Sequence, residues 1–332
     1  MTDAIVGIHG CGVTGQSTGR VVRLRGLRLA WFDIAPGASE RARRRYEGVS
    51  LDRADDLSAT DVVVLASPVT HAEVARSFVA HGVDVVSLSD DIDDVRSLLD
   101  LHEFALERGA RVVVGAALAP GLSGILTRHL ADQLDLADEI HVATHGTAGP
   151  SCARQHHHAL GNTALGWHDG QWLERPGGSG RELCWFPDPI GPADCYRAAL
   201  PDPLLLRRAF PEVERISARV SATRRDRLTS RLPMLSPPHS QGGRGAVRVE
   251  VRGAGPGGER VTHVAGAVGR TADLAGTVAA MYAAACVERR LPEGVTVAGD
   301  ERDVNAWLLS GIVGAGVTVQ QYNGEARASS LT

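Results

Sequence analysis

Short apolar runs alternate with segments of helical spacing through the first third of the chain. Five of the runs are rich in Val, Ile and Leu and have the length of strands. The expected strands are Ile5–His9, Leu29–Phe32, Asp61–Ala66, Val83–Leu88 and Arg111–Val114, and the expected helices are Val13–Arg25, His71–Ala80 and Asp93–Arg108. Strands that are apolar throughout are typical of a parallel sheet covered on both faces. The pattern therefore predicts a doubly wound α/β domain.

Residues 122–267 break this alternation. Strands are expected at Glu139–His145, Ser217–Thr223, Ala246–Arg252 and Arg260–Val268, and helices at Ser151–Leu165, Thr271–Arg289 and Glu301–Leu309. The glycine-rich loop at 253–258 joins the last two strands as a hairpin. We expect the helices after it to return to the first domain. The predicted division is residues 1–121 plus 268–332 as the doubly wound domain and residues 122–267 as an α+β domain.

A glycine-rich turn follows the first expected strand and opens the first expected helix. Its six residues fit the pattern G-x-G-x-x-G: Gly10, Cys11, Gly12, Val13, Thr14 and Gly15. In this motif the first glycine makes the tight turn, the second lets the backbone approach a pyrophosphate, and the third lets the helix pack closely on the strand. The N–H groups at the start of the helix attract the anion. We therefore predict a Rossmann-type dinucleotide site at these residues.

Asp33 ends the second expected strand, at about the distance along the chain where a carboxylate binds the adenosine ribose. A carboxylate about 4 Å from the 2′-phosphate of NADP(H) would cost roughly 4 kcal/mol near a protein surface. NAD(H) is therefore the expected cofactor. NADP(H) stays an alternative, because Arg41 and Arg43–Arg45 follow and would reach a phosphate unless they form a solvated helix face.

Polar residues follow the third and fourth expected strands. Ser67 and Pro68 end the third strand, and Ser89 follows the fourth. Ligands of doubly wound sheets bind at the carboxyl ends of the strands. We therefore expect Ser67, Pro68 and Ser89 beside the cofactor, with Ser67 and Pro68 next to the nicotinamide. His71, in the first turn of the next helix, is expected at the surface.

Three segments of the first domain follow one another as they do in a known family. The run VDVVSLSD at 83–90, the helix through residues 101–103 (LHE) and the loop GAALAPGL at 115–122 resemble saccharopine dehydrogenase-like oxidoreductases. The resemblance covers the chain up to residue 130. It implies a split cofactor domain, an α+β substrate and dimerisation domain, a homodimer, and NAD(P)-linked oxidation of an amine or reduction of an imine.

Two departures from that family pattern bear on the function. Ser87 and Ala119 stand where the family commonly has Asp, so saccharopine itself is not the expected substrate. The run SPVTHAEVA at 67–75 is similar to the nicotinamide loop of glucose-fructose oxidoreductase-like sugar dehydrogenases, but their Glu-Lys-Pro motif is replaced by Leu-Ser-Asp at 88–90. A sugar dehydrogenase without the usual lysine is one alternative function. A non-catalytic dinucleotide-binding sensor is the other.

The amino-acid composition excludes several reaction mechanisms and kinds of partner. All 35 basic residues are Arg, so a lysine Schiff base, a lysine general base and a P-loop lysine are excluded. The formal net charge of −4 gives the protein no net positive electrostatic field that would attract the phosphate backbone of a nucleic acid. No stretch reaches the roughly 20 apolar residues of a membrane span. The five scattered cysteines are typical of reduced thiols in a cytoplasmic protein, and a small molecule is the expected partner.

Without lysine, the acid or base of an enzyme must be a His, Cys, Tyr or carboxylate near the cleft. Arg154 precedes three consecutive histidines at 156–158, and His145 ends the expected strand before them. A histidine there would donate a proton as hydride arrives at a CH–NH or CH–OH carbon, and Arg154 would bind a substrate carboxylate. The predicted catalytic residues are His157, His158, Arg154 and His145, with surface or structural roles as the alternative. No metal is predicted, because His145, His156 and His158 lack the spacing of zinc ligands.

Overall fold

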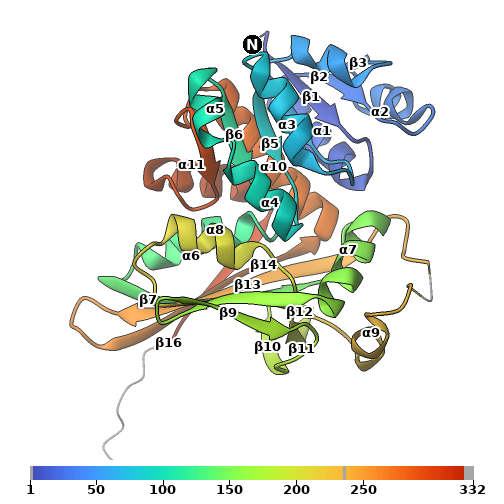
Figure 1. Cartoon of the computed structure of the whole chain (residues 1–332). Helices are drawn as coiled ribbons and strands as arrows, with labels where there is room; N and C mark the ends of the chain where they lie inside the picture. The colour runs from blue at the N-terminus through green and yellow to red at the C-terminus, as the bar shows by residue number, and fades with distance from the viewer. Residues whose placement is uncertain (1–2, 235–236, 325–332) are drawn as a thin grey trace, which may run out of the picture.

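The structure, a computed structural model, describes residues 3–234 and 237–324, and it consists of two sheets with helices between and around them (Figure 1). The first sheet has seven strands in the order β15-β6-β5-β4-β1-β2-β3, and all its neighbours pair in parallel. Its strands are β1 (Ile5–His9), β2 (Arg28–Phe32), β3 (Val49–Ser50), β4 (Val62–Leu65), β5 (Asp84–Ser87), β6 (Arg111–Val114) and β15 (Gly294–Val297). The strand order reverses at β1, which is where doubly wound sheets bind their ligands. The predicted α/β fold class is confirmed.

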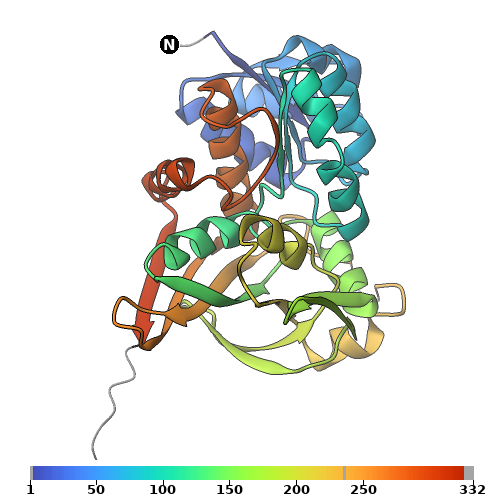
Figure 2. The same cartoon turned by 60° about the vertical axis from the view of Figure 1, so that its left-hand side comes forward.

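Helices cover both faces of this sheet, as Figures 1 and 2 show. They are α1 (Val13–Leu24), α2 (Ala38–Tyr46), the 3-10 helix η1 (Ala54–Ala59), α3 (His71–Ala80), α4 (Ile92–Leu99), α5 (His102–Glu107), α10 (Thr271–Val287) and α11 (Arg302–Gly314). Helices α3, α4 and α5 lie on one face, and α1, α10 and α11 lie on the other. Because both faces are covered, the central strands β4 and β6 are buried at every residue.

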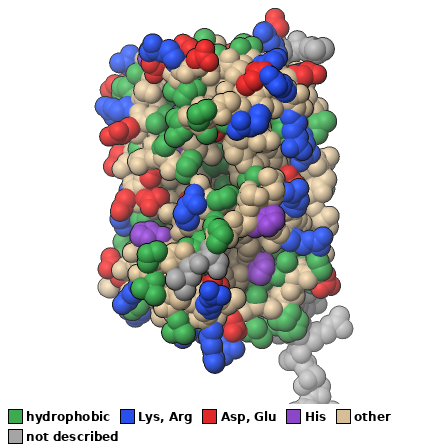
Figure 3. Space-filling model, turned by 90° about the vertical axis from the view of Figure 1, so that its right-hand side faces the viewer, with side chains coloured by type: hydrophobic (Ala, Val, Ile, Leu, Met, Phe, Trp, Pro, Cys, Tyr) green, Lys and Arg blue, Asp and Glu red, His purple; other side chains and the backbone are tan. Residues whose placement is uncertain are grey.

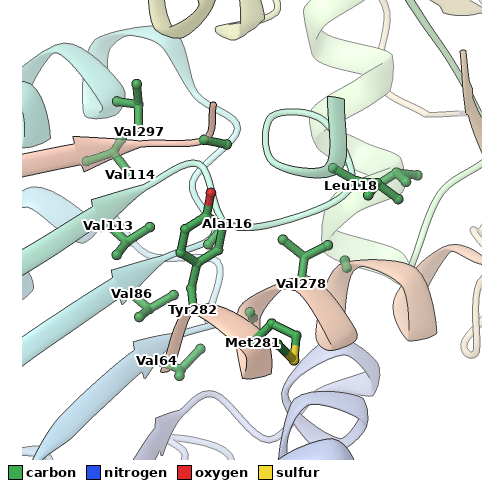
Figure 4. Close-up of a cluster of buried hydrophobic side chains, with 14 of the residues drawn as sticks. Val64, Val86, Val113, Val114, Ala116, Leu118, Val278, Met281, Tyr282 and Val297 are labelled. Atoms are coloured by element: carbon green, nitrogen blue, oxygen red, sulfur yellow. The ribbon is translucent and has the colours of Figure 1, made fainter. Parts of the chain in front are cut away.

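Helix α10 is buried around almost its whole circumference, between the first sheet, α1 and the second sheet. In Figure 4, Tyr282 of α10 lies beside the valines of the first sheet. Small side chains make this burial compatible with close packing. A Cβ added at Gly276 would lie 2.7 Å from Cβ of Ser17 on α1. The alanine-rich composition of α10 therefore reflects tight helix packing, as the sequence indicated.

The second sheet has nine strands and is mixed. Its main path is β10-β11-β12-β7-β13-β14-β16, and the β8–β9 hairpin extends from β12. The strands are β7 (Leu136–His145), β8 (Thr163–His168), β9 (Gln171–Pro176), β10 (Glu182–Phe186), β11 (Gly191–Arg197), β12 (Arg215–Ser221), β13 (Arg244–Ala254), β14 (Arg260–Arg270) and β16 (Thr318–Gly324). The helices of this region are α6 (Leu122–Ala131), α7 (Pro150–Gly161), α8 (Asp202–Ala209) and α9 (Arg224–Thr229). Helices α6 and α8 lie between this sheet and the first domain (Figures 1 and 2).

Two details differ from the sequence expectation. The helix expected to reach Leu165 ends at Gly161, and β8 begins at Thr163, because the Gly-Asn pair stops the helix. Strand β16 pairs with β14 in the second sheet, although the predicted division placed the whole of 268–332 with the first domain. Helices α10 and α11 do return to the first domain, and residues 325–332 lie outside the described part of the chain.

The five cysteines are all free thiols. In the described ranges, every helix is too short or too polar to cross a lipid bilayer.

Candidate active-site cleft

A cleft of about 1480 Å³ lies between the carboxyl edge of the first sheet and helix α7. One wall consists of the glycine-rich turn, Asp33 and the segments 66–71 and 88–91; the other consists of Thr144 and the segments 148–152, 154–158 and 230–234. Figure 3 views this side of the molecule, where histidine side chains border a hollow. Pockets for one small ligand usually measure about 300–1,000 Å³. This cleft is therefore large enough for a dinucleotide and a second small molecule together.

The glycine-rich turn has the geometry that its sequence predicted. Gly10 adopts a φ of +107°, which favours glycine, and an added Cβ there would lie 2.6 Å from the backbone nitrogen of Ser67. An added Cβ at Gly15 would collide with the carbonyl oxygen of Gly10, whereas one at Gly12 would meet no atom within 4 Å. Gly12 precedes α1, and no described side chain caps that helix. The first N–H groups of α1 therefore face the cleft without an acceptor inside the helix.

The carboxylate of Asp33 is fixed beside this turn. Its Oδ2 accepts a hydrogen bond from the Cys11 N–H at 2.6 Å, and its Oδ1 accepts one from the Ala35 N–H at 2.7 Å. The Cys11 side chain points away from the cleft: its thiol donates to the carbonyl oxygen of Phe32, and burial raises the pKa of Cys11 to about 12. Only the backbone of Cys11 therefore belongs to the binding turn.

The four arginines after Asp33 are not equivalent. Arg43 and Arg44 form ion pairs with Glu40, and the guanidinium of Arg45 lies over the ring of Tyr46. Arg41 instead donates from Nη1 to the carbonyl oxygen of Pro36 at 3.3 Å, in the turn that follows Asp33. Of these four guanidinium groups, that of Arg41 is therefore the one bound to the turn that follows Asp33.

The loop after β4 is held by two histidines. His71 Nδ1 lies 2.8 Å from Ser87 Oγ, and its Nε2 lies 2.9 Å from the carbonyl oxygen of Ser67. His9 Nδ1 lies 2.9 Å from Ser67 Oγ. His71 is only 3% exposed, and burial lowers its pKa. The expectation that His71 lies at the surface is therefore wrong: it joins the ends of β4 and β5.

The predicted cofactor residues at the strand ends do line the cleft. Ser67 and Pro68 border it after β4, and Ser89 borders it after β5. The Ser89 N–H donates to Ser87 Oγ at 3.2 Å, so both loops depend on the same hydroxyl group. The structure thus brings into one cleft the three residues that the sequence placed beside the cofactor, of which Ser67 and Pro68 were predicted to lie next to the nicotinamide.

The predicted catalytic residues divide between the two faces of the second sheet. Arg154, His157 and His158 lie on α7 and line the cleft; Arg154 and His158 are exposed, and His157 Nε2 lies 2.9 Å from the carbonyl oxygen of Leu232. His145 does not line the cleft. Its ring packs at 5.7 Å from that of Phe186, and its Nδ1 lies 2.8 Å from Ser221 Oγ. Side chains alternate between faces along a strand, so Thr144 faces the cleft and His145 cannot.

Three cleft residues were not selected from the sequence. The side chains of Asp90, Cys152 and His156 meet with their N, O and S atoms within 4.8 Å of one another. Burial raises the pKa of Asp90 and lowers that of His156, and each charge opposes the effect of burial on the other group. The i, i+4 spacing of Cys152 and His156 on α7 was the available signal, but Asp90 comes from the loop between β5 and α4, and only the fold brings it there.

A second carboxylate, that of Asp202, acts on this group. Asp202 begins α8 and is 1% exposed. Its Oδ1 accepts a hydrogen bond from Ser123 Oγ at 2.7 Å, while its Oδ2 is buried without a hydrogen-bond partner in the described structure. Burial raises the pKa of Asp202 to about 6, and its charge acts on both Asp90 and His156.

Comparison with solved structures supports this architecture, while no family model matches the sequence. Apo histidine-tagged saccharopine dehydrogenase (L-Glu forming) from Saccharomyces cerevisiae matches over 97% of this chain and 100% of its own, with 15% identity and a TM-score of 0.73. This chain has the saccharopine dehydrogenase fold. The predicted resemblance is therefore confirmed at the level of the fold.

Two further structures align over most of both chains. GenD2 from gentamicin A biosynthesis, solved in complex with NAD, has 15% identity and a TM-score of 0.50, with coverage of 98% of this chain and 97% of its own. A mutant of meso-DAPDH from Clostridium tetani, solved with DAP, has 14% identity and a TM-score of 0.51, with coverage of 91% and 95%. At these identities the likeness shows a shared fold.

Proposed function

We propose that the chain is an NAD(P)-dependent oxidoreductase that transfers hydride between the nicotinamide and a CH–NH or CH–OH carbon of a small substrate in the cleft. The main support for this proposal is that the start of α1 and the carboxylate of Asp33 line the same cleft, opposite α7. Among the described residues, no side chain caps the start of α1 there. Anions bind at such helix starts, and a carboxylate at this position binds ribose hydroxyls.

The cofactor would extend along the carboxyl edge of the first sheet. Its pyrophosphate would accept hydrogen bonds from the N–H groups that follow Gly12, and its adenosine ribose would donate to Asp33. Its nicotinamide would lie toward Ser67, Pro68 and Ser89, which line the same cleft. NAD(H) is the preferred form, because Asp33 would repel a 2′-phosphate. Arg41 is the residue through which NADP(H) would be accommodated instead.

The second wall supports an anionic substrate. Arg154 and Arg231 both line the cleft and are exposed, so their guanidinium groups remain available for a carboxylate or phosphate. A substrate held by these groups would lie across the cleft from the nicotinamide end of the first wall. The bond formed or broken is then the C–H bond at a carbon that bears nitrogen or oxygen.

The proposal is tested in two steps with the purified protein. The first is titration with NADH and NADPH, followed by the change in cofactor fluorescence. The second is a screen of imines, of keto acids with amines and of sugar acids, in which oxidation of NADH is recorded. Binding followed by consumption with one substrate supports the oxidoreductase. Binding without consumption across the screen supports the non-catalytic sensor, and no binding of either nucleotide rejects both.

A further inference from the structure

The group formed by Asp90, Cys152 and His156 combines three chemically different ligand atoms. Cys152 and His156 are one helical turn apart on α7, so their side chains project from the same face. Asp90 approaches them from the loop between β5 and α4. The carboxylate oxygen, the thiol sulfur and the imidazole nitrogen all lie within 4.8 Å of one another. Side chains from two domains therefore converge on one point of the cleft.

In the described part of the chain, no arginine is among the groups whose charge acts on Asp90. The side chains whose charge acts on Asp90 are His156, Asp91 and Asp202. Asp202 receives one hydrogen bond from Ser123 and keeps its buried Oδ2 without a partner in the described structure. Two carboxylates and a thiol are therefore grouped around one neutral or singly charged imidazole. Buried carboxylates normally have a cation or hydrogen-bond donors as partners.

We propose that Asp90, Cys152 and His156 bind a zinc ion, with the fourth coordination position open to the cleft. Zinc is bound by sulfur at about 2.3 Å and by nitrogen or oxygen at about 2.0–2.2 Å, which places neighbouring ligand atoms roughly 3.3–3.8 Å apart. Side-chain movements of about 1 Å would bring the three atoms from their present positions to this spacing. Calcium and magnesium prefer oxygen ligands, whereas a mixed S, N and O set suits zinc.

The open fourth position is the arrangement of catalytic rather than structural zinc sites. Asp90 directly follows Ser89, at the predicted nicotinamide end of the cleft. A metal at this position would polarise a carbonyl oxygen or hold the nitrogen of a substrate. This role rests on the proposed function, but binding of the ion does not. On binding, Cys152 loses its thiol proton to solvent, and the second charge of the ion neutralises Asp90.

The direct test is metal analysis and cobalt titration of the purified full chain without a histidine tag. We expect about one zinc ion per chain after expression with zinc. We also expect the metal-free protein to take up one equivalent of Co²⁺ and develop the sulfur-to-cobalt charge-transfer band that requires a thiolate ligand. Absence of both zinc and this band in the unaltered protein overturns the proposal without any variant.

Variants assign the ligands. Cys152→Ser should abolish the charge-transfer band, and His156→Asn should weaken Co²⁺ binding by at least about 100-fold, because even loss of groups outside the ligand set costs about 10- to 100-fold. The matched control is the His157→Asn, His158→Asn double variant, which alters the adjacent histidines and should keep one equivalent of Co²⁺ with the band. Metal held only by the histidine run would disappear in this control and persist in Cys152→Ser. That result contradicts the proposal.

NADH binding is then measured on each metal-free variant. It shows whether a variant that fails to bind metal has also lost its fold or its cofactor site. We expect Cys152→Ser and His156→Asn to bind NADH as the unaltered metal-free protein does. Zinc without NADH binding would reject the proposed function and keep the metal site. NADH binding without zinc or cobalt uptake would reject the metal site alone.

Discussion

Replacement of Gly12 by Ala distinguishes a cofactor site from a purely structural turn. The backbone at Gly12 has φ −68° and ψ −172°, which alanine adopts without strain, and the added Cβ would meet no protein atom within 4 Å. Loss of a good N-cap residue costs up to about 1 kcal/mol, and the reduced freedom of the unfolded chain returns about 0.4–1 kcal/mol. Since the two effects oppose each other, the free energy of unfolding should change by less than about 1 kcal/mol.

The effect on the cofactor should be much larger. The methyl group enters the space in which the second glycine of the motif allows a pyrophosphate to approach the backbone. Overpacking of this kind costs about 1–3 kcal/mol, which corresponds to roughly 5- to 150-fold weaker binding of NADH. The assays are fluorescence titration with NADH and urea unfolding monitored by circular dichroism.

The matched control is Gly314→Ala, which adds a methyl group at the exposed end of α11, where an added Cβ also meets no atom within 4 Å. This variant should bind NADH as the unaltered protein does. If Gly12→Ala leaves NADH binding within twofold of the unaltered value, the pyrophosphate does not lie at this turn and the reasoning is refuted. If it unfolds the protein, the turn has a structural role that the open space around Gly12 does not predict.

Three further predictions concern the cofactor preference, the proton donor and stability. Asp33→Asn should reduce the preference for NADH over NADPH by about 10- to 100-fold, since a half-exposed carboxylate contributes less than the roughly 4 kcal/mol of an unscreened pair; an unchanged ratio of dissociation constants would count against ribose binding by Asp33. His157→Asn combined with His158→Asn should abolish turnover of an identified substrate if either histidine delivers the proton, and an unchanged kcat would remove both from the mechanism. Burial lowers the pKa of His71 in the folded state, so below pH 6.5 the unfolded chain binds a proton that the folded protein does not, and this group lowers stability by up to about 1.4 kcal/mol per pH unit as the pH falls. Urea unfolding between pH 7.5 and 5.5 should therefore show a smaller loss for His71→Gln than for the unaltered protein, and equal slopes would contradict the assignment.

The first domain was predictable because its signals are local. Its strands are continuous apolar runs, and the glycine-rich turn and Asp33 lie at fixed positions along a single βαβ unit. Strand β1 has the predicted bounds Ile5–His9, and α3 has the predicted bounds His71–Ala80. The short strand β15 was missed because it is separated from its partner β6 by the entire second domain.

The second wall of the cleft was less predictable, because its residues meet only through long-range pairing. His145 and Thr144 differ by one position, and the register of β7 with β13 decides which of them faces the cleft. The histidine run gave no indication that His156 lies beside Asp90, since the two residues belong to different domains. The exclusion of lysine chemistry, in contrast, follows from the composition alone and needs no structure.

The most direct measurement of the central claim is isothermal titration calorimetry of the purified protein with NADH and with NADPH. The account predicts saturable binding of one NADH per chain at submillimolar concentration and weaker binding of NADPH. No heat of binding with either nucleotide at millimolar concentration would contradict it, and the glycine-rich turn would then serve the packing of α1 on β1 alone.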